Sequence, residues 1–152
     1  MAGKQYQAAG GVVIQQGKIA GLQPQRAYLL LLDRPDRNEV RLPKGHIDPG
    51  EDARTAAVRE TAEEAGFVDL EVLADLGSHT VEFDYKGDHF IRDEHYFLMR
   101  LASSRQSQRP AHDAQQFRPL WVELERAADL LTFAAEQNVV RAALSRYMEM
   151  TA

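Results

Sequence analysis

Residues 45–67 read GHIDPGEDARTAAVRETAEEAGF, and three of their glutamates, Glu60, Glu63 and Glu64, stand at positions i, i+3 and i+4. In an α-helix this spacing places the three carboxylates on one face, within about one turn of each other. Like charges at these offsets destabilise a helix by about 0.2–0.5 kcal/mol per pair. Arg59 is the close cation, four residues before Glu63 and in the less favourable order. The cluster is therefore expected to be costly unless a cation from outside completes it.

A hard divalent metal ion is the cation that would suit this cluster. Carboxylate oxygens are ligands for Mg²⁺, which keeps several waters and binds through one or two carboxylates plus substrate phosphates. The alternative interpretation of a bare ExxEE pattern is a solvated acidic helix face. Turn formers on both sides favour a site: Pro43, Gly45, Pro49 and Gly50 come before the helix, and Gly66 can end it. The stretch therefore predicts a loop–helix–loop unit.

The fixed residues of this unit resemble the Nudix box, whose pattern is GX5EX7REUXEEXGU with U a bulky aliphatic residue. The matching positions are Gly45, Glu51, Arg59, Glu60, Glu63, Glu64 and Gly66, each at the required spacing. The two U positions are looser matches, because they hold Thr61 and Phe67. A match at this many fixed positions in one stretch is not expected by chance. The resemblance implies an α/β fold, a Nudix-type α/β/α sandwich with a mixed β-sheet and a loop–helix–loop catalytic motif.

The rest of the chain is consistent with an α/β domain. Strands are expected over residues 6–16, 27–33, 70–83, 89–101 and 120–124, and helices over 53–65, 124–131 and 136–148. Loops are expected over residues 34–40 and 103–114, the second of them mobile, with a hairpin turn at Lys86-Gly87. Asp52 is expected to cap the box helix, and Val58, Ala62 and Ala65 to face a sheet opposite the glutamates. A single domain over residues 1–152 follows.

Composition and charge exclude several classes of protein. The 152 residues are 44% hydrophobic and 27% charged, as in an ordinary globular protein, and they include no cysteine for a disulfide or a thiolate metal site. No apolar run approaches the length of a membrane span, so no membrane partner and a cytoplasmic location are expected. The formal net charge of −5 argues against DNA as a partner.

The Nudix resemblance implies a metal-dependent pyrophosphohydrolase and a set of residues that serve it. The implied metal ligands are Glu60, Glu63, Glu64 and the backbone carbonyl of Lys44, with Mg²⁺ as the cofactor and Mn²⁺ as a possible substitute. The implied catalytic residues are Glu64, as the ligand nearest the attacking water, Glu60, and the pair Arg59 and Glu51, which would orient the helix. The general base stays open among Glu94, Asp93 and Asp113.

The segments LPKGHIDPGE and RETAEEAG resemble those of the diadenosine polyphosphate hydrolases in particular. This implies a small-molecule nucleotide partner such as diadenosine tetraphosphate, for an enzyme that is a monomer or a homodimer. Lys44, His46 and Arg92 match positions that face the phosphate chain in such enzymes, and Tyr85 and Phe133 match aromatics that sandwich the adenine. The alternative without a functional role is that Lys44, His46 and Arg92 are ordinary surface side chains, and that the two aromatic residues serve only in packing.

Two other interpretations stay open. One is a Nudix hydrolase for another nucleotide, such as a damaged triphosphate, a nucleotide sugar or a capped RNA end. The other is a nucleotide-binding regulatory domain on the same fold without turnover. The intact set of three box glutamates argues against the regulatory domain, which would not need all of them.

Overall fold

The computed structural model of the chain describes residues 3–17, 19 and 21–152. Its strands are β1 (Lys4–Gln16), β2 (Ala27–Arg34), β3 (Glu39–Arg41), β4 (Lys44–His46), β5 (Leu70–Tyr85), β6 (Asp88–Leu101) and β7 (Arg118–Glu123). Its helices are α1 (Ala53–Ala65), α2 (Ala111–Gln116), α3 (Leu124–Leu130) and α4 (Ala134–Thr151), with a 3₁₀ turn η1 at Pro35–Arg37. None of these helices combines the length and apolar character that crossing a bilayer requires.

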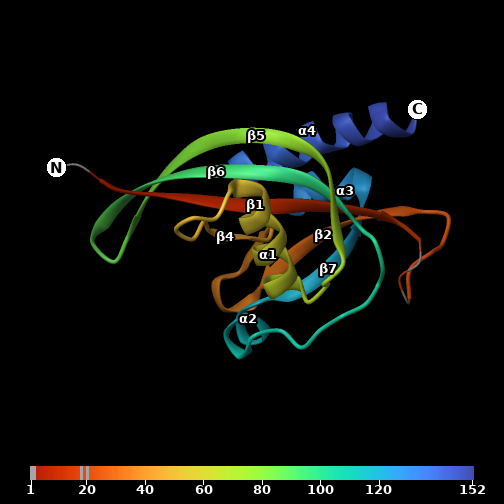
Figure 1. Cartoon of the computed structure of the whole chain (residues 1–152), viewed down its shortest axis with the longest axis horizontal. Helices are drawn as coiled ribbons and strands as arrows, with labels where there is room; N and C mark the ends of the chain where they lie inside the picture. Colours follow the sequence, from red (N-terminus) through yellow and green to blue (C-terminus); the bar gives the residue numbers. More distant parts are fainter. Residues whose placement is uncertain (1–2, 18, 20) are drawn as a thin grey trace.

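The strands form one mixed sheet in the order β3-β2-β1-β6-β5, with β4 added beside β1 and β7 beside β2. β1 and β6 run parallel, whereas the other pairs are antiparallel. Figure 1 shows α1 crossing one face of this sheet, while α3 and α4 lie toward its other face. The predicted α/β class with a mixed sheet and helices on its faces is confirmed.

Successive side chains of the central strands point to opposite faces of the sheet, so a hydrophobic core forms on each face. On the α1 face the core contains Ala9, Val13, Leu30, Leu32, Phe97 and Met99, packed against Ala56, Ala57 and Ala65 of the helix. On the other face the core contains Val12, Ile14, Leu29, Leu31, Tyr96 and Leu98, packed against Ala127 of α3 and Val140 and Ala143 of α4. The sheet is therefore the middle layer of a sandwich, and α1 is held rigidly on it.

The long elements agree with the expected ranges to within a few residues, and the short ones do not. α2 lies inside the stretch that was expected to be a loop over residues 103–114, and β3, β4 and η1 occupy the expected loop and the lead into the box. These elements have three to six residues, which is too few for an apolar period to appear. The hairpin at Lys86-Gly87 is present, with positive φ at both residues.

The box helix begins and ends where the sequence predicts, but its buried face is different. Asp52 caps it by accepting a hydrogen bond from Thr55 N at 2.7 Å, and Gly66 ends it in the left-handed conformation with φ 87°. The buried residues of the helix are Ala56, Ala57, Thr61, Glu64 and Ala65. Ala65 is buried as predicted, and Val58 packs against this core while only partly buried, but Ala62 is not among the buried residues. The helix is rotated so that one glutamate faces inward with the alanines.

Thr61, at a position where the box pattern has an aliphatic residue, is fully buried and carries an unpaired hydroxyl. Its Oγ1 has no hydrogen-bond partner among the residues that the structure describes. A buried polar group without a partner is destabilising. We therefore expect Thr61→Val to raise the free energy of unfolding by about 1 kcal/mol. Thermal melts should show an increase of about 2–4 °C for a chain of this size.

The control for this substitution is Thr132→Val, because the Thr132 hydroxyl accepts a hydrogen bond from Val40 N at 2.8 Å. Removal of that acceptor should lower the melting temperature. A drop in both variants would contradict the inference that the Thr61 hydroxyl is unsatisfied.

Candidate active site

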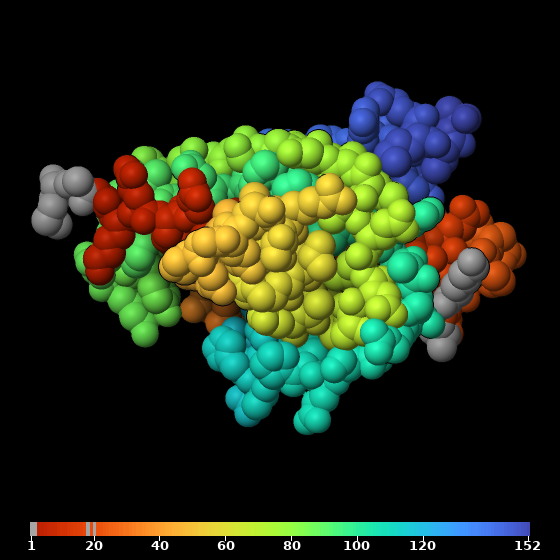
Figure 2. All heavy atoms as spheres, in the orientation of Figure 1, coloured from red at the N-terminus to blue at the C-terminus, as the bar shows by residue number. Residues whose placement is uncertain are grey.

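The acidic end of α1 opens onto a pocket of about 380 Å³. Carboxylates line it from two elements, Glu60, Glu63 and Glu64 from α1 and Asp113 from α2, with Gly45 and His46 of β4 beside them. We call it the carboxylate pocket. Figure 2 shows the box loop and α1 on the exposed near face of the molecule, next to the segment that contains α2.

The guanidinium group of Arg59 forms hydrogen bonds to several residues at the edge of this pocket. Arg59 binds Glu51 with two hydrogen bonds, from Nε to Oε2 at 2.8 Å and from Nη2 to Oε1 at 2.9 Å. Its Nη1 donates to Glu60 Oε1 at 2.7 Å and, more weakly, to Glu63 Oε2 at 3.4 Å, and Nη2 donates to the backbone oxygen of His46 at 3.0 Å. Arg59 thus connects the loop before the helix to two of the three clustered glutamates.

These contacts set the ionisation of the cluster. The hydrogen bonds from Arg59 lower the pKa of Glu51 to about 2, so this carboxylate stays charged. The pKa of Glu60 is raised above its ordinary value, chiefly by burial. The Arg59–Glu51 pair therefore supplies a fixed salt bridge, whereas burial disfavours the charged form of Glu60.

Glu64 differs from its two neighbours in being buried, with 8% of its surface exposed. Its Oε1 accepts a hydrogen bond from the backbone N–H of Lys44 at 2.8 Å, which ties α1 to β4. Burial raises the pKa of Glu64 to about 8, because the charged form loses its hydration there. A cation bound beside Glu64 would offset this desolvation and keep the carboxylate ionised.

The donor chemistry of the pocket fits a hard divalent ion. The Glu60 carboxylate lies against Gly45, where a Cβ atom would overlap it. The backbone next to Lys44 therefore borders the acidic cluster. Among the described residues, however, no three acidic or histidine side chains are arranged so that they could hold an ion. Arg59 and the Lys44 N–H occupy the carboxylates instead. The carboxylate oxygens of Glu60, Glu63 and Glu64 are nonetheless of the kind that Mg²⁺ takes as ligands.

The three candidates for a general base occupy different places. Asp113 lines the carboxylate pocket, and burial raises its pKa above the ordinary value. Glu94 is buried beside Arg92 and His79, 2.7 Å and 2.9 Å away, and faces a neighbouring pocket. Asp93 lies on the opposite face of β6, where it accepts from Thr80 Oγ1 at 2.6 Å and lines neither of these pockets. The geometry favours Asp113 and disfavours Asp93.

Tyr85 and Phe133 come together at a second pocket, of about 660 Å³, which we call the aromatic pocket. They are exposed by 43% and 42% respectively. Tyr85 ends β5, and Phe133 directly precedes α4. Five residues line both this pocket and the carboxylate pocket: Tyr6, Arg34, Arg41, Lys44 and Arg92. The two pockets therefore adjoin each other, with the Tyr85 and Phe133 rings in one and the three box glutamates in the other.

The three residues expected to face a phosphate chain have different surroundings. His46 is exposed at the carboxylate pocket and lies against the Tyr6 ring, with centroids 4.3 Å apart. Arg92 Nε lies 2.7 Å from Glu94 Oε2, close enough for an ion pair although not in hydrogen-bond geometry, and Nη1 donates to Tyr6 Oη at 2.9 Å. Lys44 is buried, and its Nζ lies 2.6 Å from Glu136 Oε2.

Glu136, in the first turn of α4, is a site residue that sequence reasoning missed. It is 2% exposed, accepts from Lys44 Nζ through Oε2, and accepts from the backbone N–H of Leu42 through Oε1 at 3.0 Å. Its position after Phe133 gives no periodic signal that it reaches β4, 92 residues away in sequence from Lys44. The Lys44–Glu136 ion pair fixes the backbone segment that holds Glu64.

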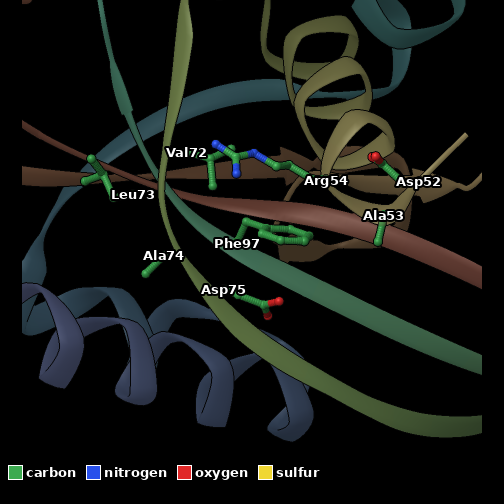
Figure 3. A pocket seen from close by; sticks show the side chains of 8 residues that line it. All are labelled: Asp52, Ala53, Arg54, Val72, Leu73, Ala74, Asp75 and Phe97. Atoms are coloured by element: carbon green, nitrogen blue, oxygen red, sulfur yellow. The ribbon is translucent and has the colours of Figure 1, made fainter.

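A further hollow, of about 390 Å³, lies between the first turn of α1 and β5 (Figure 3). Its polar residues are Asp52, Arg54 and Asp75, and Phe97 forms its floor. The box glutamates do not line it. The presence of all three box glutamates therefore distinguishes the carboxylate pocket as the candidate active site.

Comparison with known proteins identifies the family of the chain. The family model described as NUDIX domain matches residues 6–144. The chain belongs to the Nudix family. The predicted membership and the prediction of a Nudix pyrophosphohydrolase are confirmed.

Individual Nudix relatives are similar over most of the chain. A bis(5'-nucleosyl)-tetraphosphatase [asymmetrical] of Caenorhabditis elegans is 33% identical over 134 residues, 88% of this chain and 91% of that protein. A mutator protein, MutT4, of Mycobacterium tuberculosis is 33% identical over 138 residues, but the chain spans only 53% of its length. A crystal structure of a C. elegans Ap4A hydrolase binary complex superposes with a TM-score of 0.68 at 28% identity, covering 95% of this chain and 98% of that one.

The similarity to the diadenosine polyphosphate hydrolases is thus confirmed as a similarity. The site residues, the single domain over residues 1–152, the cytoplasmic location and the monomeric or homodimeric state stay predictions.

Proposed function

We propose that this Nudix domain hydrolyses a phosphoanhydride bond of a dinucleoside polyphosphate, for which diadenosine tetraphosphate is the representative substrate, with Mg²⁺ as cofactor and Mn²⁺ as a substitute. The observation that carries the proposal is that the two pockets adjoin each other and share five lining residues. A nucleoside with a phosphate chain has an aromatic base at one end and a phosphoanhydride beyond it. The exposed Tyr85 and Phe133 rings would meet the base, and the box glutamates of the adjoining pocket would lie beside the phosphates.

Each group of the carboxylate pocket has a role in this proposal. Glu60, Glu63 and Glu64, with the Lys44 carbonyl, would hold the metal, and Glu64 would be nearest the attacking water. The bound metal lowers the pKa of a bound water and neutralises charge on the phosphate oxygens. Arg59 and Glu51 orient the helix and its carboxylates through their two hydrogen bonds.

Asp113 is the general base that we favour. It lines the same pocket as the glutamates, and burial moves its pKa upward, toward the range in which a carboxylate can accept a proton efficiently. Water adds to one phosphorus atom, its proton passes to the base, and a bridging P–O bond breaks. Diadenosine tetraphosphate would then yield two nucleotides whose phosphates sum to four, such as AMP and ATP.

Tyr85 and Phe133 would hold the adenine between them in the aromatic pocket. A base stacked on an aromatic ring contributes about 1–3 kcal/mol, so Tyr85→Ala and Phe133→Ala should each raise the Michaelis constant by about tenfold or more. Because both rings are more than 40% exposed, we expect the loss of stability to be smaller than the 3–5 kcal/mol typical of emptying a buried phenylalanine site. Steady-state kinetics and thermal melts on the same samples measure both effects.

Leu130→Ala is the matched control, because Leu130 is similarly exposed at 38% and lines neither pocket. It should leave the Michaelis constant unchanged. If the two aromatic variants lose stability strongly and keep wild-type Michaelis constants, both rings are packing residues and the adenine site lies elsewhere.

A substrate panel tests the proposed function. Diadenosine tetraphosphate, a nucleoside diphosphate sugar, an oxidised deoxynucleoside triphosphate and a 5'-triphosphorylated RNA would be compared with saturating Mg²⁺, with products identified by chromatography. The highest kcat/KM is expected for diadenosine tetraphosphate. A higher value for any other member would replace the proposed substrate, and nucleotide binding without turnover of any member would indicate a regulatory domain.

A further inference from the structure

Two arginines at the junction of the pockets differ from their neighbours in how their charge is compensated. Of the four cationic side chains that line both pockets, Lys44 is paired with buried Glu136 at 2.6 Å and Arg92 with buried Glu94 at 2.7 Å. Within the described part of the chain, the carboxylates nearest Arg34 and Arg41 are Asp36 at 3.3 Å and Glu39 at 3.7 Å. Neither of these two guanidinium groups therefore has a buried carboxylate within hydrogen-bond distance among the residues that the structure describes.

The partners of the two arginines are weak for different reasons. The Asp36 side chain is 59% exposed, so water and salt screen its attraction for Arg34. Glu39 lies beyond hydrogen-bond distance from Arg41, and its Oε2 has no hydrogen-bond partner among the described residues. Arg34 and Arg41 are themselves only 10% and 15% exposed. A charge removed from water to this degree is costly unless a counter-charge meets it.

The fold holds both guanidinium groups in place. Antiparallel pairing sets Arg34 opposite Glu39 and Leu32 opposite Arg41, so the side chains of Arg34 and Arg41 leave the same face of the sheet as core residue Leu32. Both guanidinium groups also lie over the buried Phe117 ring, with their Cζ atoms 5.5 Å and 5.6 Å from its centroid. Stacking on an aromatic ring fixes the plane of a guanidinium group and leaves its edge donors free.

We propose that Arg34 and Arg41 form an anion site that binds the phosphate chain of the substrate where it passes from the aromatic pocket to the carboxylate pocket. These two side chains, rather than Lys44 and Arg92, supply the positive charge that the phosphates meet. Planar guanidinium groups donate two parallel hydrogen bonds to a phosphate, which suits this task. The inference rests on the proposed function for the identity of the ligand as a nucleoside polyphosphate.

The probe for this site is inorganic tripolyphosphate, which has the phosphate chain and no base. Its dissociation constant would be measured by isothermal titration calorimetry with the 152-residue chain, first with saturating Mg²⁺ and then with EDTA. We expect Arg34→Gln and Arg41→Gln each to weaken binding by about tenfold or more, since each removes charge-assisted hydrogen bonds. Arg34→Lys and Arg41→Lys keep the charge but lose the planar fork, so an intermediate loss of about threefold or more is expected.

Arg146→Gln is the matched control, because Arg146 on α4 has a 55% exposed side chain and lines neither pocket. It should change tripolyphosphate affinity by less than about twofold, as expected of a screened charge outside the site. Thermal melts show whether each variant is folded. If Arg34→Gln does not fold, the two lysine variants and Arg41→Gln, on edge strand β3, test the proposal. Wild-type affinity in the Arg41 variants, an equal loss in Arg146→Gln, or no tripolyphosphate binding by the wild-type protein in either condition overturns the proposal.

This outcome is separable from that of the proposed function. If the arginine variants retain tripolyphosphate affinity while the wild-type protein hydrolyses diadenosine tetraphosphate best, only the anion site fails. If the variants lose affinity but another substrate gives the highest kcat/KM in the panel, the anion site is supported and the substrate assignment is wrong.

Discussion

Glu64→Gln should lower turnover of diadenosine tetraphosphate by at least about 10²-fold, comparable to the removal of one preorganised electrostatic group from an active site. The substitution keeps the size of the side chain and leaves an oxygen to accept the hydrogen bond from Lys44 N. The loss should therefore come from the missing negative charge rather than from a change in fold. Initial rates at saturating Mg²⁺ and substrate, with circular dichroism of the same sample, measure both.

The same variant should be more stable than the wild-type protein once metal has been removed with EDTA. Burial raises the pKa of Glu64 to about 8 in the folded chain, from 4.5 in the unfolded chain. Between about pH 4.5 and 8, Glu64 is therefore protonated in the folded chain and ionised in the unfolded chain. The free energy of unfolding of the wild-type protein consequently declines as the pH rises from about 4.5 through 8. The glutamine variant lacks this decline. Wild-type turnover in Glu64→Gln would remove Glu64 from the catalytic set, whatever its melting temperature.

Lys44→Met should lower the free energy of unfolding by about 3–5 kcal/mol, which is the cost of leaving one member of a buried ion pair unpaired. The Glu136 carboxylate would lose its contact with Lys44 Nζ at 2.6 Å while remaining 2% exposed. Adding Glu136→Gln should recover most of this loss, because glutamine is uncharged and can still accept from Leu42 N. Urea denaturation of the single and double variants measures the recovery.

The comparison pair for this effect is Arg146 and Glu149 on α4, which are 3.7 Å apart and well exposed. Glu149→Gln should change stability little, because solvent screens such a pair. If Lys44→Met is no more destabilising than Glu149→Gln, the Lys44–Glu136 pair does not hold the backbone segment before the box.

The parts of the fold that could be predicted are those with long apolar patterns or fixed spacing. Runs such as Val12–Ile14 and Leu29–Leu32 alternate between the two cores, and the box fixes the start and end of α1. α2 could not be predicted in the same way, because its sequence AHDAQQ buries no residue and has no apolar period. Its position mattered most for the site, since it brings Asp113 to the three box glutamates.

Spacing alone also could not show which box glutamate is buried. Glu60, Glu63 and Glu64 lie on the same side of the helix. Ala57, Thr61 and Ala65 pack on the sheet, and this orientation of the helix buries Glu64. Lys44 illustrates the same limit, because a lysine in a glycine-rich loop is expected to be exposed, and only the tertiary fold brings Glu136 to it. Contacts between residues distant in sequence decided both cases.

The central claim is that the acidic face of α1 becomes a hydrolytic site when a divalent cation completes it. The most direct measurement follows release of AMP and ATP from diadenosine tetraphosphate by one protein sample in EDTA, then after addition of Mg²⁺ in excess of the chelator. We predict no turnover in EDTA and full turnover after Mg²⁺ is restored. Equal rates in the two conditions, or no hydrolysis with Mg²⁺ present, would contradict the account.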